Sequence, residues 1–286
     1  MIEGDTPNSM GGTALHNSFA FFLPSGMEPQ NYYLMLAHEY FHSWLGGKIH
    51  REEQEELTKW FTEGFTDYYS RVLAMRSGII SVNDFILECN QFFRNYYLSP
   101  VLNEPNTRIQ TDFWKKHDVE KLPYYRGFMF AIYLNNFIKL NNKDNSLDNV
   151  MLDLFKATQA TKDKKFSTAL FKNIMKKYIP HGIDKEIADF IEKGKTIDLS
   201  NVTTNLPLQK INMGVFDLGF DLDTLVNEYV IKNIDIKSNA YKAGLREGNK
   251  AIGWDITHNP DQIATIITAN NNVFKYRPEQ KKDIYQ

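Results

Sequence analysis

The sequence predicts a multidomain α+β protein, with a short β segment, a mainly α-helical domain and a β-rich domain in that order. At 286 residues the chain is long enough for more than one domain. From residue 30 to residue 193 apolar side chains recur at helical spacing, whereas after Gly194 short apolar runs alternate with Asp and Gly, as in strands and turns. We therefore expect domains at residues 1–29, 30–200 and 207–286.

The first expected element is a strand. Gly11 and Gly12 open the segment, the apolar run from Phe19 to Leu23 forms the strand, and Pro24-Ser25-Gly26 ends it in a turn. Helices follow, several of them with a serine N-cap. The expected helices are Gln30 to Trp44, Glu52 to Arg76, Ser81 to Tyr97, Tyr124 to Leu140, Ser146 to Ala160, Ser167 to Tyr178 and Asp184 to Lys193.

Composition excludes several classes of protein. The chain has 33 basic and 35 acidic residues and a net charge of -2, so nothing indicates nucleic acid as a partner. No stretch of about eighteen apolar residues exists, which predicts no membrane span. The start, Met1 to Pro7, lacks the features of a signal peptide, and the compartment stays unknown, either cytoplasmic or periplasmic. The single cysteine, Cys89, lies among apolar residues and reads as a buried, inert thiol.

Two histidines four residues apart are the strongest functional signal. In His38-Glu39-Tyr40-Phe41-His42 the spacing is H-E-x-x-H, which places both imidazoles on one helix face, where they can bind one metal ion. Glu39 is then the candidate general base. Two histidines on the surface of an amphipathic helix are the alternative.

A catalytic zinc ion needs a third protein ligand and an open position for water. Glu63 is the candidate, because the 20 residues between it and His42 allow a loop and an antiparallel return. Asp67, one turn further, is either an acceptor for the outer N–H of a ligand histidine or a solvated acid. We expect one zinc ion per chain on His38, His42 and Glu63, with Glu39 assisting attack of the zinc-bound water on a peptide bond.

These motifs resemble those of a known family. H-E-Y-F-H-S-W-L-G-G-K from His38 to Lys48, followed by W-F-T-E-G-F-T-D-Y-Y from Trp60 to Tyr69, is similar to the gluzincin zinc metallopeptidases, and most closely to the glycyl aminopeptidase family. The resemblance implies a helical, thermolysin-like catalytic domain preceded by a short β segment. It also implies an aminopeptidase that prefers small N-terminal residues, Gly or Ala, on a peptide substrate.

Two further segments extend the resemblance. In these relatives a tyrosine before a basic residue and a glycine contacts the oxyanion, and Pro123-Tyr124-Tyr125-Arg126-Gly127 matches at Tyr125, with Tyr124 as the fallback. The family also carries a C-terminal PDZ domain, and Leu218-Gly219-Phe220 looks like its carboxylate-binding loop. The segment from Ser238 to Asn249 is similar to the PDZ motif S-x-A-x-x-A-G-L-x-x-G-D. This implies a PDZ-like domain that either binds a peptide or protein C-terminus by strand addition or packs without a ligand.

One departure from the family leaves the substrate open. The glycine-rich strand before the zinc helix usually carries a Glu for the substrate's free amino group, whereas this chain has Ala14 there, unless Glu3, Glu104 or another acid takes that role. Gly11 and Gly12 remain a candidate substrate edge, because glycine lets another backbone approach closely. An endopeptidase or oligopeptidase is therefore an alternative to the aminopeptidase. A catalytically inactive PDZ-bearing peptide-binding protein is a third reading, which the intact Glu39 disfavours.

Overall fold

The computed structural model describes residues 2–3, 11–15, 18–23, 32–163, 165–200, 202, 208–257 and 260–285. The chain forms two compact units, one up to Gln209 and one from Lys210 to Tyr285. The change from helical to strand-like spacing of apolar residues, seen in the sequence near residue 200, lies close to this division. Within the described residues, no helix is both long enough and apolar enough to cross a bilayer.

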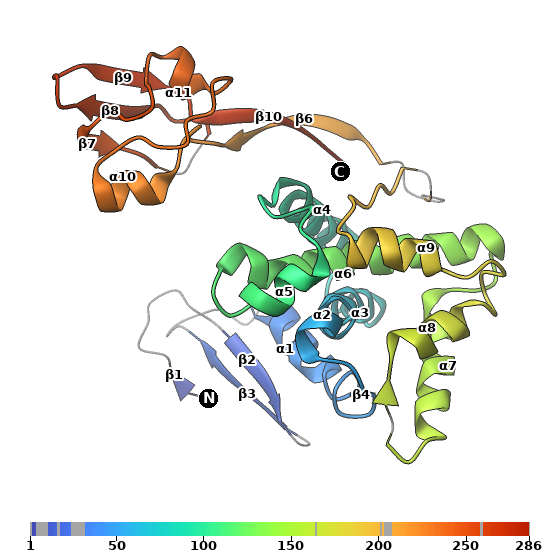
Figure 1. Cartoon of the computed structure of the whole chain (residues 1–286). Helices are drawn as coiled ribbons and strands as arrows, with labels where there is room; N and C mark the ends of the chain where they lie inside the picture. The colour runs from blue at the N-terminus through green and yellow to red at the C-terminus, as the bar shows by residue number, and fades with distance from the viewer. Residues whose placement is uncertain are drawn as a thin grey trace. The chain divides into compact units, whose positions relative to one another are not determined.

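Three strands open the first unit: β1 (Ile2–Glu3), β2 (Gly11–Leu15) and β3 (Ser18–Leu23). β3 pairs in parallel with β1 and antiparallel with β2, so β2 lies at one edge of this sheet. The strand expected at residues 19–23 is confirmed as β3, and the turn expected at residues 24–26 lies outside the described residues. β2 packs beside the first helix, α1 (Tyr33–Phe41) (Figure 1).

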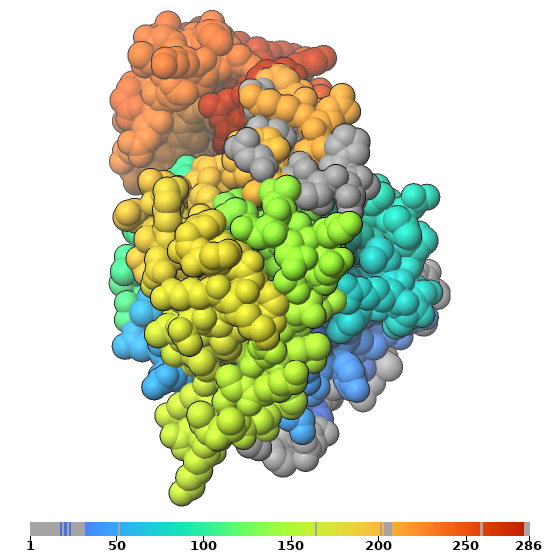
Figure 2. Space-filling model, turned by 90° about the vertical axis from the view of Figure 1, so that its right-hand side faces the viewer, coloured from blue at the N-terminus to red at the C-terminus, as the bar shows by residue number. Residues whose placement is uncertain are grey.

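Helices make up most of the remainder of the first unit. They are α2 (Glu55–Thr62), α3 (Gly64–Arg76), α4 (Val82–Leu98), α5 (Asn106–Asp112), α6 (His117–Asn141), α7 (Leu147–Gln159), α8 (Thr168–Met175), α9 (Asp184–Glu186) and the π-helix η2 (Ile187–Glu192). Two short strands, β4 (His50–Arg51) and β5 (Lys165–Phe166), pair in parallel. The long helix α6 packs against α2, α3, α4, α5 and α7, and the segment from α7 to η2 forms much of one face (Figures 1 and 2).

The helix expected from Glu52 to Arg76 is interrupted at Glu63. Glu63 lies between α2 and α3 with φ −92° and ψ −50°, and helical hydrogen bonds continue on both sides of it. The interruption coincides with a close crossing, because a Cβ on Gly64 would overlap the backbone of Gly127 in α6. The crossing helix therefore meets the chain directly after Glu63.

The other expected helices are present with shifted ends. α1 ends at Phe41 instead of Trp44, because the chain turns back through Gly46, whose φ of +118° favours glycine. Ser81 and Ser146 form capping boxes at α4 and α7, as their sequence positions predict. α6 begins at His117 and contains Pro123, while α5 has no counterpart among the expected helices.

Aromatic side chains fill the core of the first unit beneath the site. Trp60 and Phe61 of α2 are fully buried, and the Phe61 ring stacks on Phe166 of β5 with centroids 4.0 Å apart. Phe128 of α6 stacks on Phe92 of α4 at the same centroid distance. Burying such rings contributes roughly 2–3 kcal/mol each. These ring contacts pack α2 against β5 and α6 against α4.

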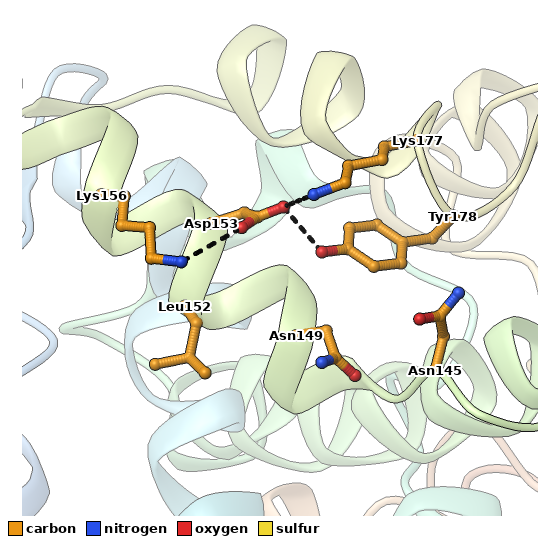
Figure 3. Close-up of a pocket in the computed structure, with 7 residues that line it drawn as sticks. All are labelled: Asn145, Asn149, Leu152, Asp153, Lys156, Lys177 and Tyr178. Atoms are coloured by element: carbon orange, nitrogen blue, oxygen red, sulfur yellow. Dashed lines mark hydrogen bonds and ion pairs between the residues drawn. The ribbon is translucent and has the colours of Figure 1, made fainter.

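A polar pocket of the first unit ties α7 to the turn that follows α8. Asp153 accepts hydrogen bonds from Lys177 at 2.5 Å and from the hydroxyl of Tyr178 at 2.7 Å, and Lys156 lies 3.9 Å away (Figure 3). The bond from Lys177, followed by that from Tyr178, holds the pKa of Asp153 below its usual range. These side chains use one another as hydrogen-bond and ion-pair partners, so the pocket links α7 to the turn after α8.

The second unit is built from five strands and two short helices in the described residues. They are β6 (Lys210–Phe216), α10 (Leu222–Glu228), α11 (Asn239–Lys242), β7 (Ala251–Asp255), β8 (Ala264–Thr268), β9 (Val273–Tyr276) and β10 (Glu279–Tyr285). β6 and β10 form an antiparallel ribbon, while β7, β8 and β9 form an antiparallel sheet. Its core includes Leu218, Leu225, Ile231, Leu245, Ile266 and Tyr276.

Candidate metal centre

His38, His42 and Glu63 come together where α1 lies beside the junction of α2 and α3 in the first unit. His38 lies on α1, His42 caps its C-terminus, and Glu63 lies at the junction of α2 and α3. The Nε2 atoms of the two histidines are 3.0 Å apart, and Glu63 Oε2 lies 3.4 Å from His38 Nε2 and 3.3 Å from His42 Nε2. The ligand atoms of all three residues lie within 4.8 Å of one another. The two histidines and the glutamate that the sequence predicts as ligands thus lie together in the structure.

The outer atom of each histidine has its own partner. His38 Nδ1 lies 2.9 Å from Asp67 Oδ1, and His42 Nδ1 lies 3.2 Å from the carbonyl oxygen of Leu45. Both acceptors favour a proton on Nδ1, so Nε2 is the atom of each ring that is available to a metal ion. Asp67 is held in turn by Arg71, whose Nη1 lies 2.8 Å from Asp67 Oδ1.

The geometry fits a tetrahedral metal ion. Zinc bonds to nitrogen and carboxylate oxygen are about 2.0–2.1 Å long, so tetrahedral ligand atoms stand roughly 3.3 Å apart. The three distances between the ligand atoms, 3.0, 3.3 and 3.4 Å, match that spacing. Two imidazoles with one carboxylate are also a ligand set that zinc uses in catalytic sites. Donor chemistry and spacing therefore agree on the kind of group the site accommodates.

The electrostatics of the cluster favour a cation. Burial lowers the pKa of His38, but Asp67 and then Glu63 outweigh burial and raise that pKa to about 10. Burial raises the pKa of Glu63, but hydrogen bonds from His38 and His42 outweigh it and hold that pKa well below its usual range. Without a metal ion, the site therefore keeps a positive charge on His38 between two carboxylates. A bound cation supplies that charge in its place.

Glu39 lies beside the cluster and is itself buried, at 8% exposure. Burial raises the pKa of its carboxyl group, and the neighbouring His38 and His42 oppose the rise. A carboxylate in such surroundings is a stronger base than one in water. Its position next to His38 in the sequence and its burial together suit it to proton transfer.

Tyr124 and Tyr125 of α6 have different surroundings. The ring of Tyr124 stacks on the imidazole of His38, with centroids 6.3 Å apart and planes 21° apart. The ring of Tyr125 instead packs edge-on against Phe92, at 5.9 Å between centroids. Burial and then the charge of Glu63 raise the pKa of Tyr124 above its usual value, which keeps its hydroxyl protonated. Tyr124, the second choice from the sequence, is thus the tyrosine that stacks on a candidate ligand, His38.

The sequence interpretation missed two charged residues near the cluster, Lys59 and the Arg71 that pairs with Asp67. Lys59 of α2 is buried at 4% exposure, and its Nζ lies 4.0 Å from Glu63 Oε1. The signal available in the sequence is its spacing, because residues four apart share a helix face. The carbonyl group of Leu45, which accepts from His42, was also missed. Every residue has a backbone carbonyl, so the sequence alone does not identify such an acceptor.

The remaining sequence candidates lie elsewhere in the chain. Gly11 and Gly12 pair with Phe22 and Phe21 of β3, and Ala14 lies on the same strand, β2, which packs beside α1. A substrate edge at these glycines stays a prediction.

Leu218-Gly219-Phe220 lies between β6 and α10 in the second unit. Gly219 has φ +77°, and its N–H donates to the Asp217 side chain at 2.7 Å. The carbonyl of Leu218 accepts from the Tyr276 hydroxyl, and that of Gly219 accepts from the N–H of Asp235. These polar backbone groups are used within the unit, and peptide binding at this loop stays a prediction.

Fold and site together are typical of one class of protein, the metallopeptidases with an H-E-x-x-H helix and a glutamate on the following helix. Residues 31–154, which include His38, Glu39, His42, Glu63 and Tyr124, match the M61 glycyl aminopeptidase family. The match to this segment agrees with the resemblance seen in the sequence.

A solved structure gives an independent comparison of the fold. The chain is similar to an aminopeptidase N family protein from Idiomarina loihiensis, with a TM-score of 0.62 and 18% sequence identity. The match covers 98% of this chain and 57% of that one, so the present chain spans a little more than half of its length. A likeness at this identity shows a shared fold. The search of curated proteins found no match.

Proposed function

We propose that this chain is a zinc-dependent metallopeptidase, and that it removes small N-terminal residues, Gly or Ala, from peptides. The observation that supports the proposal most strongly is the cluster of His38, His42 and Glu63, whose ligand atoms lie within 4.8 Å of one another. These three residues would hold one zinc ion. When bound, the ion acts as a Lewis acid toward water and the peptide carbonyl.

Glu39 moves the proton in this proposal. Its buried carboxylate takes a proton from the attacking water and later delivers it to the nitrogen of the leaving amine. A general base positioned in this way contributes about 10²–10⁴-fold to the rate. The raised pKa of Glu39 serves both steps, because a stronger base accepts the proton and its conjugate acid still releases it.

Tyr124 is our choice for the hydroxyl that stabilises the oxygen on which negative charge develops. It stacks on His38, whereas Tyr125 packs against Phe92. The raised pKa of Tyr124 keeps its hydroxyl protonated, as a hydrogen-bond donor must be. A donor of this kind contributes roughly 2.7–4 kcal/mol to stabilisation of the transition state.

The choice between exopeptidase and endopeptidase depends on the strand beside the site. β2 packs against α1, and the family match favours an aminopeptidase. Ala14 on β2, where the family has a Glu for the substrate ammonium, supports an endopeptidase or oligopeptidase as the second candidate.

Reporter peptides distinguish these functions. Purified protein is assayed on Gly-, Ala- and Leu-capped reporters, each with a free and an N-acetylated amino group, with and without a zinc chelator. We expect chelator-sensitive cleavage of the free Gly and Ala reporters. Equal or faster cleavage of the acetylated reporters would establish the endopeptidase alternative. Cleavage that survives full removal of metal would contradict a metallopeptidase of either kind.

A further inference from the structure

Lys59 occupies an unusual position for a lysine. It lies on α2 one turn before Glu63, and it is 4% exposed. Its Nζ lies 4.4 Å from the ring centroid of Phe113 and 5.7 Å from that of Trp114. The same atom lies 3.0 Å from Glu55 Oε1 and 4.0 Å from Glu63 Oε1. A buried ammonium group is costly unless charged or polar partners compensate for lost water.

Glu55 alone does not account for this burial. Its side chain is 44% exposed, so its carboxylate is largely solvated and compensates only in part for the water that the Lys59 ammonium group loses. A lysine that served Glu55 alone would gain more by extending its ammonium group into water. The buried carboxylate that the ammonium group of Lys59 faces is that of Glu63.

The two oxygens of Glu63 face different groups. Oε2 lies within 3.4 Å of both Nε2 atoms of the histidine pair, while Oε1 lies on the side of Lys59. His38 and His42 already have outer partners in Asp67 and the Leu45 carbonyl. Such partners orient metal ligands, and their loss typically costs 10–100-fold in metal affinity.

We propose that Lys59 is a positioning residue for the candidate metal centre: its buried ammonium group holds Glu63 Oε1, so that Oε2 alone is presented to the metal ion. This inference rests on the proposed function, because it assigns a role within the same site. With Lys59, each of the three candidate ligands has an outer partner.

The proposal predicts an effect opposite in sign to simple electrostatics. Removing a positive charge near a cation site reduces repulsion, and Coulomb's law alone predicts tighter zinc binding. A positioning role predicts weaker binding, because the Glu63 carboxylate loses its fixed orientation. The sign of the change in zinc affinity therefore separates the two accounts.

The test is a zinc competition titration of metal-free protein against a chromogenic chelator at fixed pH. We expect Lys59→Met to weaken zinc binding by about 10–100-fold and Lys59→Arg, which keeps the charge, to retain most of the affinity. Lys172→Met, which removes an equal charge that is paired with Asp184, is the matched control and should bind zinc like the wild type.

The possible outcomes are distinct. Unchanged or tighter zinc binding by Lys59→Met would overturn the inference while leaving the proposed function intact. Absence of zinc binding by the wild type would instead overturn the proposed function. If Lys59→Met does not fold, Lys59→Gln compared with Lys59→Arg provides the same test of sign, with the far-ultraviolet circular dichroism of each metal-free variant as the check on folding.

Discussion

Gly64 and Gly127 meet where α6 crosses the junction of α2 and α3. A Cβ on Gly127 would stand 2.8 Å from the Cα of Gly64 and would also overlap the carbonyl oxygen of Trp60. Gly64 directly follows Glu63, and Gly127 lies three residues after Tyr124. This close approach of two backbones therefore sets the distance between a candidate ligand and the tyrosine that stacks on His38.

Gly127→Ala should damage both stability and the site. Its new methyl group has no room, and overpacking of this kind costs about 1–3 kcal/mol. Urea unfolding should show that loss, and kcat/KM should fall because α6 is displaced. Gly253→Ala is the control, since its Cβ would meet only an ordinary contact of 3.8 Å with Ile267. A Gly127→Ala protein with wild-type stability and activity would show that the crossing does not position the site.

Removing the hydroxyl group from each of the two tyrosines of α6 should affect kcat differently. Tyr124→Phe removes the hydroxyl of the ring that stacks on His38, and kcat should fall roughly a hundredfold to a thousandfold with the metal retained. Tyr125→Phe removes a hydroxyl from the ring beside Phe92 and should change kcat little. Steady-state kinetics on one reporter peptide compares both variants. The reverse order of effects would restore Tyr125, the first choice from the sequence.

Asp67→Ala should weaken zinc binding by about 10–100-fold. His38 Nδ1 then loses the acceptor at 2.9 Å that fixes its tautomer and ring orientation. Competition with a chelator measures the affinity. Asp153→Ala is a matched control, because Asp153 is also an acid paired with a basic side chain, in the separate pocket of Figure 3. Equal zinc affinity in wild type and Asp67→Ala would show that Asp67 does not orient His38 for metal binding and contributes only to the stability of the fold.

Cys89 should resist thiol reagents in the folded protein. Burial is the main cause that raises the pKa of its thiol to about 12. At pH 8 its thiolate fraction is then roughly a thousandfold below that of an ordinary cysteine. The reaction should accelerate about tenfold per pH unit up to that pKa, because the thiolate is the reactive form. Rapid modification of native protein at pH 8, at the rate seen in denaturant, would contradict this burial.

Sequence periodicity predicted most helices of the first unit but not their interruptions. Serine caps are local, so Ser81 and Ser146 identified the starts of α4 and α7 correctly. The break at Glu63 depends on Gly127, more than sixty residues away, and no local pattern reveals such a contact. α5 was missed because its seven residues are too few for a clear apolar repeat.

The candidate site shows the same division between local and distant information. The H-E-x-x-H spacing is local and identified His38 and His42. Glu63 was predicted from the number of residues that separate it from His42, which allows a loop and an antiparallel helix. The choice between Tyr124 and Tyr125 depends on which face of α6 meets α1, and one residue of difference turns a side chain by about 100°. The role of Lys59 depends on its burial under Phe113, which is a property of the folded chain.

Zinc content measured together with hydrolysis tests the central claim most directly. Metal analysis of wild type, Glu63→Gln and Glu39→Gln is paired with cleavage of a Gly-capped reporter. We predict one zinc ion per chain in wild type, loss of zinc and activity in Glu63→Gln, and retained zinc without activity in Glu39→Gln. A wild-type protein that binds no zinc, or a Glu39→Gln protein that cleaves at the wild-type rate, would contradict the account.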